Sequence, residues 1–251
     1  MCIIILNKTG ILPKEHFENS IWRNKDGAGL MYAVDGKLHT FKSLKPKEVV
    51  EEYYRLREKY NDVPIGIHFR LETDGGINTE NCHPYEVNSE TMLMHNGILG
   101  RYSNMQTNMS DTRLFIADIL SRIPTATIFT NHMLKLIAQA IGVGNKFLLI
   151  NKHGSYAIVN EGSGHWDDNK ENWYSNDSYK PWEPLGYVKG TYSKNGKRGR
   201  KAKAATPKYG REVDFYPRYN DFCEYCEKQI YSIFEIERRC CNDCYEIMLT
   251  D

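Results

Sequence analysis

The stretch MCIIILNK (residues 1–8) decides the fold, because a cysteine directly after the initiator methionine is followed by an unbroken apolar run. Continuous aliphatic residues with β-branching predict a buried strand over residues 2–6. Cys2 then has two interpretations. It is either a small apolar residue of that strand, or a working group of an enzyme that first loses Met1.

The second interpretation has a chemical basis. A cysteine is small enough for methionine aminopeptidase to remove the methionine before it, which would leave one residue with both a thiol and a free α-amine. Such an amine has an ordinary pKa of about 7.7–8.0 and can accept the thiol proton at neutral pH. Nucleophile and base would then belong to Cys2 alone.

Length and composition limit the class of protein. The 251 residues suffice for one sizeable domain and an appendage, and the apolar fraction of 41% fits a globular core. No apolar run approaches the roughly 20 residues of a membrane span, so no membrane partner is expected. The N-terminus does not resemble a secretory signal, which makes a cytoplasmic location the expectation. The cysteines, crowded toward the C-terminus, indicate thiol or metal chemistry rather than disulfides.

Periodicity along the first 180 residues predicts an α+β fold. Strands are expected in hairpins and helices in separate blocks, which favours antiparallel sheets with helices packed outside them. The expected helices are 13–24, 46–60, 110–123 and 132–142. The expected strands are 2–6, a hairpin over 28–43 that turns at Asp35-Gly36, 64–71, 91–95, a hairpin over 146–160, and 172–179.

The composition changes after about residue 177. We predict a main domain over 2–180, a basic linker over 181–219 and a small cysteine module over 220–251. Between Lys189 and Arg211 lie nine basic residues and no acidic one. A solvated linker is the favoured explanation, and a phosphate-binding arm that brings the chain to nucleic acid is the alternative.

Four short segments of the main domain carry polar groups that could serve Cys2. Arg70 ends a predicted strand, and His83-Pro84, His95-Asn96-Gly97 and Ser110-Asp111 follow in that order. Each has a structural explanation. Asn-Gly is the standard two-residue hairpin turn, Ser110 is a good helix N-cap and Asp111 suits the first turn of a helix.

Taken together and in this order, the segments resemble the glutaminase domain of class II glutamine amidotransferases, which are N-terminal-nucleophile hydrolases. That family carries an N-terminal cysteine followed by R-x-x-T-x-G, H-P, H-N-G and S-D-T segments, and RNKDGAG (23–29) is similar to its R-G-x-D-G-x-G segment. The resemblance covers about residues 2–180. The chain departs from the family at Ile3, where glycine is usual, and at Glu72 and Asp74.

The resemblance implies a four-layer αββα domain and a role for each matching residue. Cys2 would attack the side-chain amide of L-glutamine. The Asn96 amide and the Gly97 N–H would form the oxyanion hole. Arg70 would hold the α-carboxylate of the substrate, to which a guanidinium fork is suited, and Asp111 would take the α-ammonium.

Two further residues complete the substrate site that the resemblance implies. Thr73 would help to orient the carboxylate end of glutamine, and His95 would belong to the same site. Cys82, which precedes the H-P pair, is expected to be structural.

The last segment predicts a structural zinc site. Cys223-x-x-Cys226 and Cys241-x-x-Cys244 are separated by 14 residues, close to the spacing of a four-cysteine zinc ribbon. Four thiolates leave no open position on the metal, so this zinc would be structural, and glutamine hydrolysis would need no cofactor. Cys240 could replace Cys241 but would break the second C-x-x-C pair.

We therefore expect a glutamine-hydrolysing amidotransferase subunit of the stand-alone type. The roughly 70 residues after the catalytic domain are too few for a synthase domain, so the ammonia acceptor or its synthase is expected on a separate chain. Two alternatives remain open. One is an amidohydrolase acting on another γ-glutamyl or amide compound. The other is a non-catalytic scaffold for a nucleic-acid-binding zinc ribbon, which Glu72 and Asp74 keep open.

Overall fold

The computed structural model describes residues 2–72, 76–102 and 109–181 of the chain. The predicted basic linker and cysteine module, with Cys223, Cys226, Cys241 and Cys244, lie outside the described residues, as does Thr73. No helix in the described ranges is long and apolar enough to cross a membrane.

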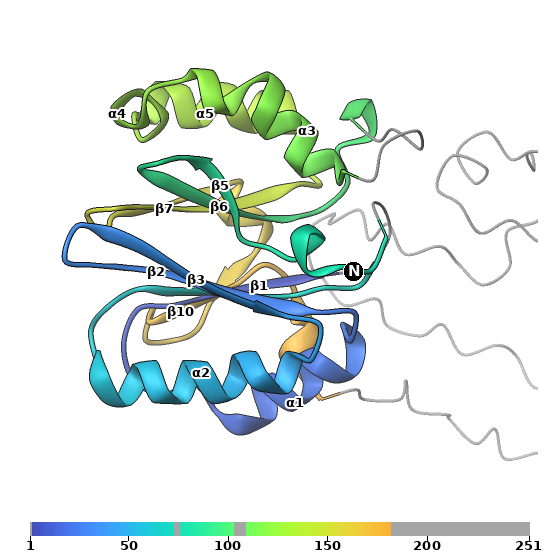
Figure 1. Ribbon diagram of the computed structural model, residues 1–251, viewed down its shortest axis with the longest axis vertical. Helices are drawn as coiled ribbons and strands as arrows, with labels where there is room; N and C mark the ends of the chain where they lie inside the picture. The colour runs from blue at the N-terminus through green and yellow to red at the C-terminus, as the bar shows by residue number, and fades with distance from the viewer. Residues whose placement is uncertain (1, 73–75, 103–108, 182–251) are drawn as a thin grey trace, which may run out of the picture. The chain divides into compact units, whose positions relative to one another are not determined.

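Two antiparallel sheets form the centre of the domain (Figure 1). The six-stranded sheet has the order β3 (Lys37–Ser43), β2 (Ala28–Val34), β4 (Ile65–Phe69), β1 (Ile3–Asn7), β10 (Asn172–Tyr174) and β9 (His165–Trp166). The four-stranded sheet has the order β5 (Tyr85–Asn88), β6 (Thr91–Asn96), β7 (Lys146–Asn151) and β8 (Tyr156–Val159).

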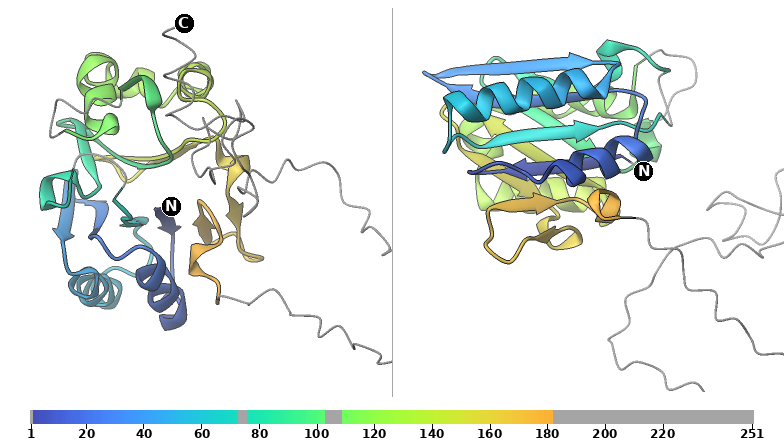
Figure 2. Two further views of the ribbon diagram at one scale, coloured as in Figure 1. Left: turned by 90° about the vertical axis from the view of Figure 1, so that its right-hand side faces the viewer. Right: turned by 90° about the horizontal axis from the view of Figure 1, so that it is seen from below.

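Helices cover the outer face of each sheet (Figures 1 and 2). The six-stranded sheet carries α1 (Lys14–Arg23) and α2 (Pro46–Lys59), and the four-stranded sheet carries α3 (Asp111–Asp118), α4 (Thr125–Ile128) and α5 (Asn131–Ile141). Three hydrophobic cores fill the spaces between these layers. The described part of the chain is therefore a four-layer αββα arrangement, and the predicted α+β class is confirmed.

The opening strand is central to this arrangement. Ile3 and Ile5 point into the core beneath α1 and α2, while Ile4 and Leu6 point into the core between the two sheets. All four side chains are fully buried. A strand covered on both faces needs an unbroken apolar sequence, which explains the run after Cys2 and confirms the predicted strand.

Most of the predicted elements are present, with some corrections. The β2–β3 hairpin turns at Asp35 and Gly36, both with positive φ, as expected for this dipeptide. Asn96-Gly97 is not a hairpin turn, because β6 pairs with β5 and β7 and the chain leaves the sheet after Asn96. The helix predicted over 110–123 ends at Asp118 and gives way to a 3₁₀ turn over Leu120–Arg122.

Arg57 anchors the C-terminal end of α2 to the six-stranded sheet. Its guanidinium is buried and donates to Asn7 Oδ1 at 2.7 Å and to the Asn7 carbonyl at 2.8 Å. It also donates to the carbonyl oxygens of Tyr60, Asn61 and Val63, in the loop that leads into β4. One side chain therefore joins a helix end, the end of β1 and the approach to β4.

We expect Arg57→Met to lower the free energy of unfolding by about 3–5 kcal/mol, because several buried acceptors lose their donor together. Arg55→Met, in the same helix, removes only an exposed ion pair to Glu52 and should cost less than about 1 kcal/mol. Urea denaturation of the two variants measures both effects. Equal losses would contradict the anchoring role.

Candidate functional site

Cys2 directly precedes β1, which lies between β4 and β10 in the six-stranded sheet. Antiparallel pairing of β1 with β4 sets Ile3 opposite Phe69, so Cys2 meets the chain as it leaves β4. The Cys2 thiol donates to the Leu71 carbonyl oxygen at 3.4 Å, and the Leu71 N–H donates to Cys2 Sγ at 3.3 Å. The thiol is therefore held by the backbone of Leu71, just beyond the end of the neighbouring strand β4.

The loop before β2 fixes the backbone of Arg70. The Arg70 N–H donates to the Gly27 carbonyl at 2.8 Å, and the Asp26 N–H donates to the Arg70 carbonyl at 2.9 Å. Asp26 Oδ2 accepts from the Glu72 N–H at 2.9 Å. Gly27 has φ +133°, and a Cβ there would lie 2.5 Å from Cys82 Sγ, so no other residue fits this position without displacement.

Two asparagine side chains converge on the Cys2 backbone. Asn96 Nδ2 and Asn176 Nδ2 both donate to the Cys2 carbonyl oxygen, the latter at 2.7 Å. Asn96 ends β6 of the four-stranded sheet, whereas Asn176 follows β10 of the six-stranded sheet. The carbonyl of Cys2 therefore links the two sheets, and the amide group of Asn96 reaches the residue it was predicted to assist.

His95 is held in one tautomer by its neighbours. Asn145 Nδ2 donates to the Ile141 carbonyl at 2.6 Å, so Asn145 Oδ1 faces His95 Nε2, 2.8 Å away, as an acceptor. Nε2 therefore carries the proton, and Nδ1 lies 2.7 Å from the Thr112 hydroxyl oxygen, which also lies 3.0 Å from Asp111 Oδ1. A Cβ at Gly97 would lie 2.1 Å from Asn145 Oδ1, which explains why glycine follows Asn96.

Asp111 begins α3 and faces the same region. Its Oδ2 accepts from the Leu99 N–H at 2.6 Å, and its Oδ1 accepts from the Thr112 N–H at 2.6 Å. Ser110 caps the helix through the Arg113 N–H, as predicted, and donates its hydroxyl proton to Tyr85 Oη at 3.1 Å. The Asp111 carboxylate thus orders the segment that follows Gly97.

These side chains line one small cavity, which we call the Cys2 cavity. Its lining includes Cys2, Arg70, His95, Gly97 and Asp111, five of the predicted site residues. Its volume is about 30 Å³, which is room for one or two water molecules. Thr73 and the four predicted zinc ligands lie outside the described residues, and the described ranges contain no cluster of three or more potential metal ligands.

The buried imidazoles around the Cys2 cavity are neutral. Burial lowers the pKa of His68 to about 3, and burial also lowers the pKa of His83 and of His95. The rings of His68 and His83 lie 4.3 Å apart between centroids, so each would also oppose a positive charge on the other. None of the three is therefore a good acceptor for the Cys2 proton at neutral pH.

Two of the positioning residues have no signal in the sequence. Asn145 comes from a segment that the sequence marks only as turn or loop. Asn176 falls in the strand predicted over 172–179, which is wrong beyond Tyr174, where β10 ends. Each contacts the site through a partner more than 45 residues away. The glycines of RNKDGAG differ from these asparagines, because the similarity of this segment to R-G-x-D-G-x-G already identifies them in the sequence. Their role is to let the backbone approach residues 70, 82 and 83 closely.

In the chain that retains Met1, the Cys2 thiol should ionise at a higher pH than a free cysteine does. Burial raises its pKa above the ordinary value, and the nearby Arg70 charge opposes this effect. We expect alkylation of Cys2 by iodoacetamide to have a midpoint above that of free cysteine, and Arg70→Met to move it higher still. Peptide mass spectrometry across pH measures both, with the exposed Arg122→Met as control. A midpoint below that of free cysteine would contradict this account.

No family model and no curated protein matches the chain. Among solved structures, it is similar to an allosteric regulatory enzyme of purine biosynthesis (22% identity, TM-score 0.45, 71% of this chain and 42% of that one). It is also similar to the glutamine phosphoribosylpyrophosphate amidotransferase of B. subtilis with ADP and GMP (19%, 0.44, 71% and 42%). A third is a glutamine aminotransferase class-II domain protein of Silicibacter pomeroyi (11%, 0.38, 69% and 87%). The chain spans less than half of the length of the first two.

Proposed function

We propose that the chain is a glutamine-hydrolysing amidotransferase subunit whose nucleophile is the thiol of Cys2 after removal of Met1. The observation that carries this proposal is the convergence of four sequence segments, those of Arg70, His83, Asn96-Gly97 and Asp111, on Cys2. Arg70, Gly97 and Asp111 line the cavity beside Cys2, and Asn96 donates to the Cys2 backbone.

The charges of the Cys2 cavity suit a free amino acid. Arg70 is 5% exposed and Asp111 is 7% exposed, so each would form a largely desolvated ion pair with a substrate group of opposite charge. A carboxylate at Arg70 and an ammonium at Asp111 would select free glutamine over an internal peptide residue. This pairing favours glutamine over the alternative amide substrates.

The reaction begins with attack of Cys2 Sγ on the side-chain amide carbon of glutamine. The thiol proton passes to the α-amine of Cys2, and the oxyanion forms beside Asn96 Nδ2 and the Gly97 N–H. Collapse of the intermediate breaks the C–N bond, and the amine proton leaves with the nitrogen as ammonia. Water then hydrolyses the glutamyl thioester to glutamate and restores the thiol.

The α-amine is the base in this scheme because the imidazoles are unsuited to it. Burial lowers the pKa of His68, His83 and His95, whereas an α-amine has an ordinary pKa of about 7.7–8.0. A protonated α-amine on Cys2 itself would also lower the pKa of the adjacent thiol. Removal of Met1 therefore supplies the base. Once this amine has taken the thiol proton, its positive charge stabilises the buried thiolate.

Glutamine must widen the Cys2 cavity to bind. The present volume of about 30 Å³ accommodates one or two water molecules, and an amino acid needs several times that space. Binding of substrate would therefore be coupled to a movement of the cavity wall. The ammonia acceptor, or the synthase that binds it, would be supplied by a separate chain.

The test is glutamate release from glutamine by protein whose intact mass shows that Met1 is absent. We expect Cys2→Ala to abolish release and Asn96→Ala to lower kcat by about 10²–10³ through loss of one oxyanion donor. Cys82→Ala removes the other described free thiol and should leave most of the activity.

An electrophilic glutamine analogue gives a second readout that needs no acceptor. It should label Cys2 only when Met1 has been removed, and free glutamine should protect against labelling. Retention of Met1 on the native protein, or failure of the processed chain both to hydrolyse glutamine and to be labelled, would favour the scaffold alternative.

We further propose that the C-terminal cysteine module binds one structural zinc ion through Cys223, Cys226, Cys241 and Cys244. Purified chain should contain about one zinc per molecule, released by a mercurial thiol reagent. Cys241→Ser should lose the metal, while Cys240→Ser should keep it because the C-x-x-C spacing survives. Loss of zinc from both variants alike, or from neither, would contradict the assignment.

A further inference from the structure

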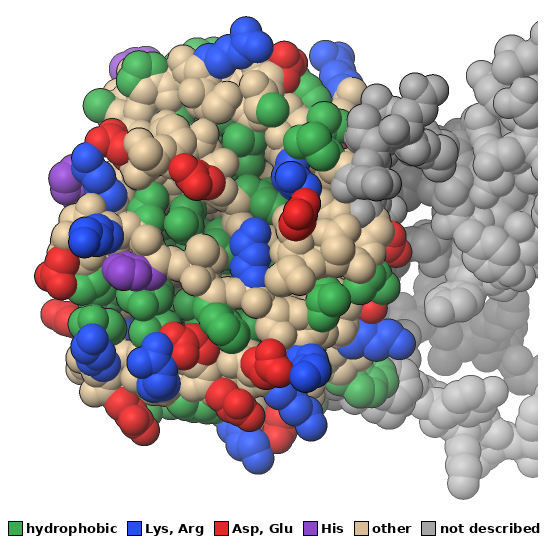
Figure 3. Space-filling view, in the orientation of Figure 1, with side chains coloured by type: hydrophobic (Ala, Val, Ile, Leu, Met, Phe, Trp, Pro, Cys, Tyr) green, Lys and Arg blue, Asp and Glu red, His purple; other side chains and the backbone are tan. Residues whose placement is uncertain are grey.

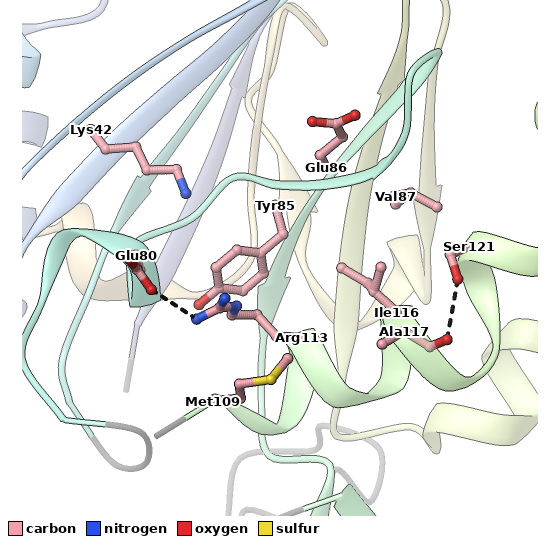
Figure 4. Close-up of a pocket in the computed structure, with 10 residues that line it drawn as sticks. All are labelled: Lys42, Glu80, Tyr85, Glu86, Val87, Met109, Arg113, Ile116, Ala117 and Ser121. Carbon is pink, nitrogen blue, oxygen red and sulfur yellow. Dashed lines mark hydrogen bonds and ion pairs between the residues drawn. The ribbon is translucent and has the colours of Figure 1, made fainter. Parts of the chain in front are cut away.

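A second and larger cavity lies beside the Cys2 cavity on the face that carries β5 and α3. It has a volume of about 630 Å³ and is walled by β3, by the 3₁₀ turn η1 (Thr79–Asn81), by β5 and by α3 (Figure 4). This volume is typical of sites for small molecules. Positively and negatively charged side chains gather around a hollow in the same face (Figure 3). We call this the α3–β5 pocket.

The cations of the pocket are more deeply placed than its carboxylates. The Arg113 side chain is 29% exposed and Lys42 is half-buried, whereas the Glu80 side chain is 82% exposed and Glu86 is exposed. Glu80 lies 3.6 Å from Arg113, at the long end for an ion pair. Carboxylates that remain in water are well solvated without a partner, whereas partly desolvated cations gain most from an incoming negative charge.

Lys42 faces an aromatic ring rather than a carboxylate. Its Nζ lies 5.1 Å from the centre of the Tyr85 ring, and no carboxylate within the described ranges lies within ion-pair distance of it. Figure 4 shows the Lys42 and Arg113 side chains entering the same space from opposite walls. Arg113 is close enough to Lys42 for its charge to lower the Lys42 pKa, so an anion in this space would be attracted by both cations.

Apart from Glu80, Glu86 and Ser121, the rest of the lining is apolar or aromatic. Val87 of β5 and Ile116 and Ala117 of α3 form the wall away from the two cations (Figure 4). Such a wall is suited to a hydrocarbon or aromatic group. The occupant should therefore carry an anionic group at one end and an apolar body at the other.

We propose that the α3–β5 pocket binds a small organic anion, a carboxylate or a phosphate ester on an apolar body, with its charged group between Lys42 and Arg113. The proposal concerns a ligand site separate from the Cys2 cavity. Anion binding there does not depend on glutamine hydrolysis. Any effect of the anion on catalysis, however, rests on the proposed function.

Anion binding at this site should be linked to protonation of Lys42. Burial lowers the pKa of the Lys42 ammonium to about 8. An anion beside it would raise that pKa again, so binding and protonation support each other. Of the other groups near Lys42, burial raises the pKa of Cys82 and of Tyr85 and lowers the pKa of His83, so all three stay neutral near pH 8. The Arg and Glu side chains around it are Arg113, Glu80 and Glu86.

The two cavities share part of their walls. Tyr85 lines both, and its hydroxyl accepts from Ser110 and donates to the Asn81 carbonyl at 2.7 Å. Arg113 donates to Asn81 Oδ1 at 3.4 Å, and its N–H donates to Ser110 Oγ. An anion that draws the Arg113 side chain toward it would therefore act on Asn81, which lines the Cys2 cavity.

The binding test uses phenyl phosphate and benzoate as probes and benzyl alcohol as the uncharged counterpart, measured by titration calorimetry on the full chain. We expect saturable binding of both anions and none of the alcohol. Lys42→Met should weaken anion binding at least about tenfold, the loss typical of one charge-assisted contact, and Lys42→Arg should restore most of it.

Lys37→Met is the matched control, because Lys37 lies on the same strand but is exposed at its other end. It should bind the probes as the unmodified chain does. Absence of saturable binding by both anions into the millimolar range, or equal affinity in Lys42→Met and the unmodified chain, would overturn the proposal.

Two further readouts separate this inference from the proposed function. Benzoate affinity should be constant below pH 8 and fall as the pH rises above it, and Lys42→Met should lose this dependence. A benzoate affinity that shows no such fall would contradict the role of Lys42. If the anions also change the rate of glutamine hydrolysis, the pocket and the proposed function are coupled. Anion binding to a chain that does not hydrolyse glutamine would support the proposed anion site and contradict the proposed glutaminase function.

Discussion

The antiparallel pairing of β1 with β4 is the constraint on which the rest of the structure depends. Five residue pairs, from Ile3 opposite Phe69 to Asn7 opposite Ile65, fix the register. Because β1 is buried on both faces, a shift by one residue would exchange the side chains of two different cores. Cys2 is thereby held against Leu71, and at the other end Arg57 holds Asn7 to the helix layer.

The sequence predicts the parts of this arrangement that depend on local pattern. The aliphatic run after Cys2, the Asp35-Gly36 turn and the apolar face of α2 each follow from residue spacing within one element. Short strands such as β5 and β9 were missed, because four and two residues give too little alternation to recognise. Asn145 and Asn176 were missed because their roles arise only when strands distant in sequence pair.

The interior around Cys2 combines several polar groups with few charges. Burial lowers the pKa of the three imidazoles, and Arg70 and Asp111 are the only Arg, Lys, Asp or Glu side chains among the described residues that line the Cys2 cavity. Opposite charges buried in one cavity act strongly on any ligand that enters, since little water screens them. Selectivity for a zwitterion would then follow from two side chains, while the imidazoles contribute shape.

The first turn of α3 serves both cavities at once. Asp111 and Arg113 are two residues apart, and successive residues of an α-helix are rotated by about 100°, so the two side chains leave the helix on nearly opposite sides. The carboxylate lines the Cys2 cavity and the guanidinium lines the α3–β5 pocket. Ser110, the N-cap of the same helix, donates a hydrogen bond to the hydroxyl of Tyr85, a residue that lines both cavities. A displacement of this turn by a ligand on one side must therefore change the position of a charge on the other.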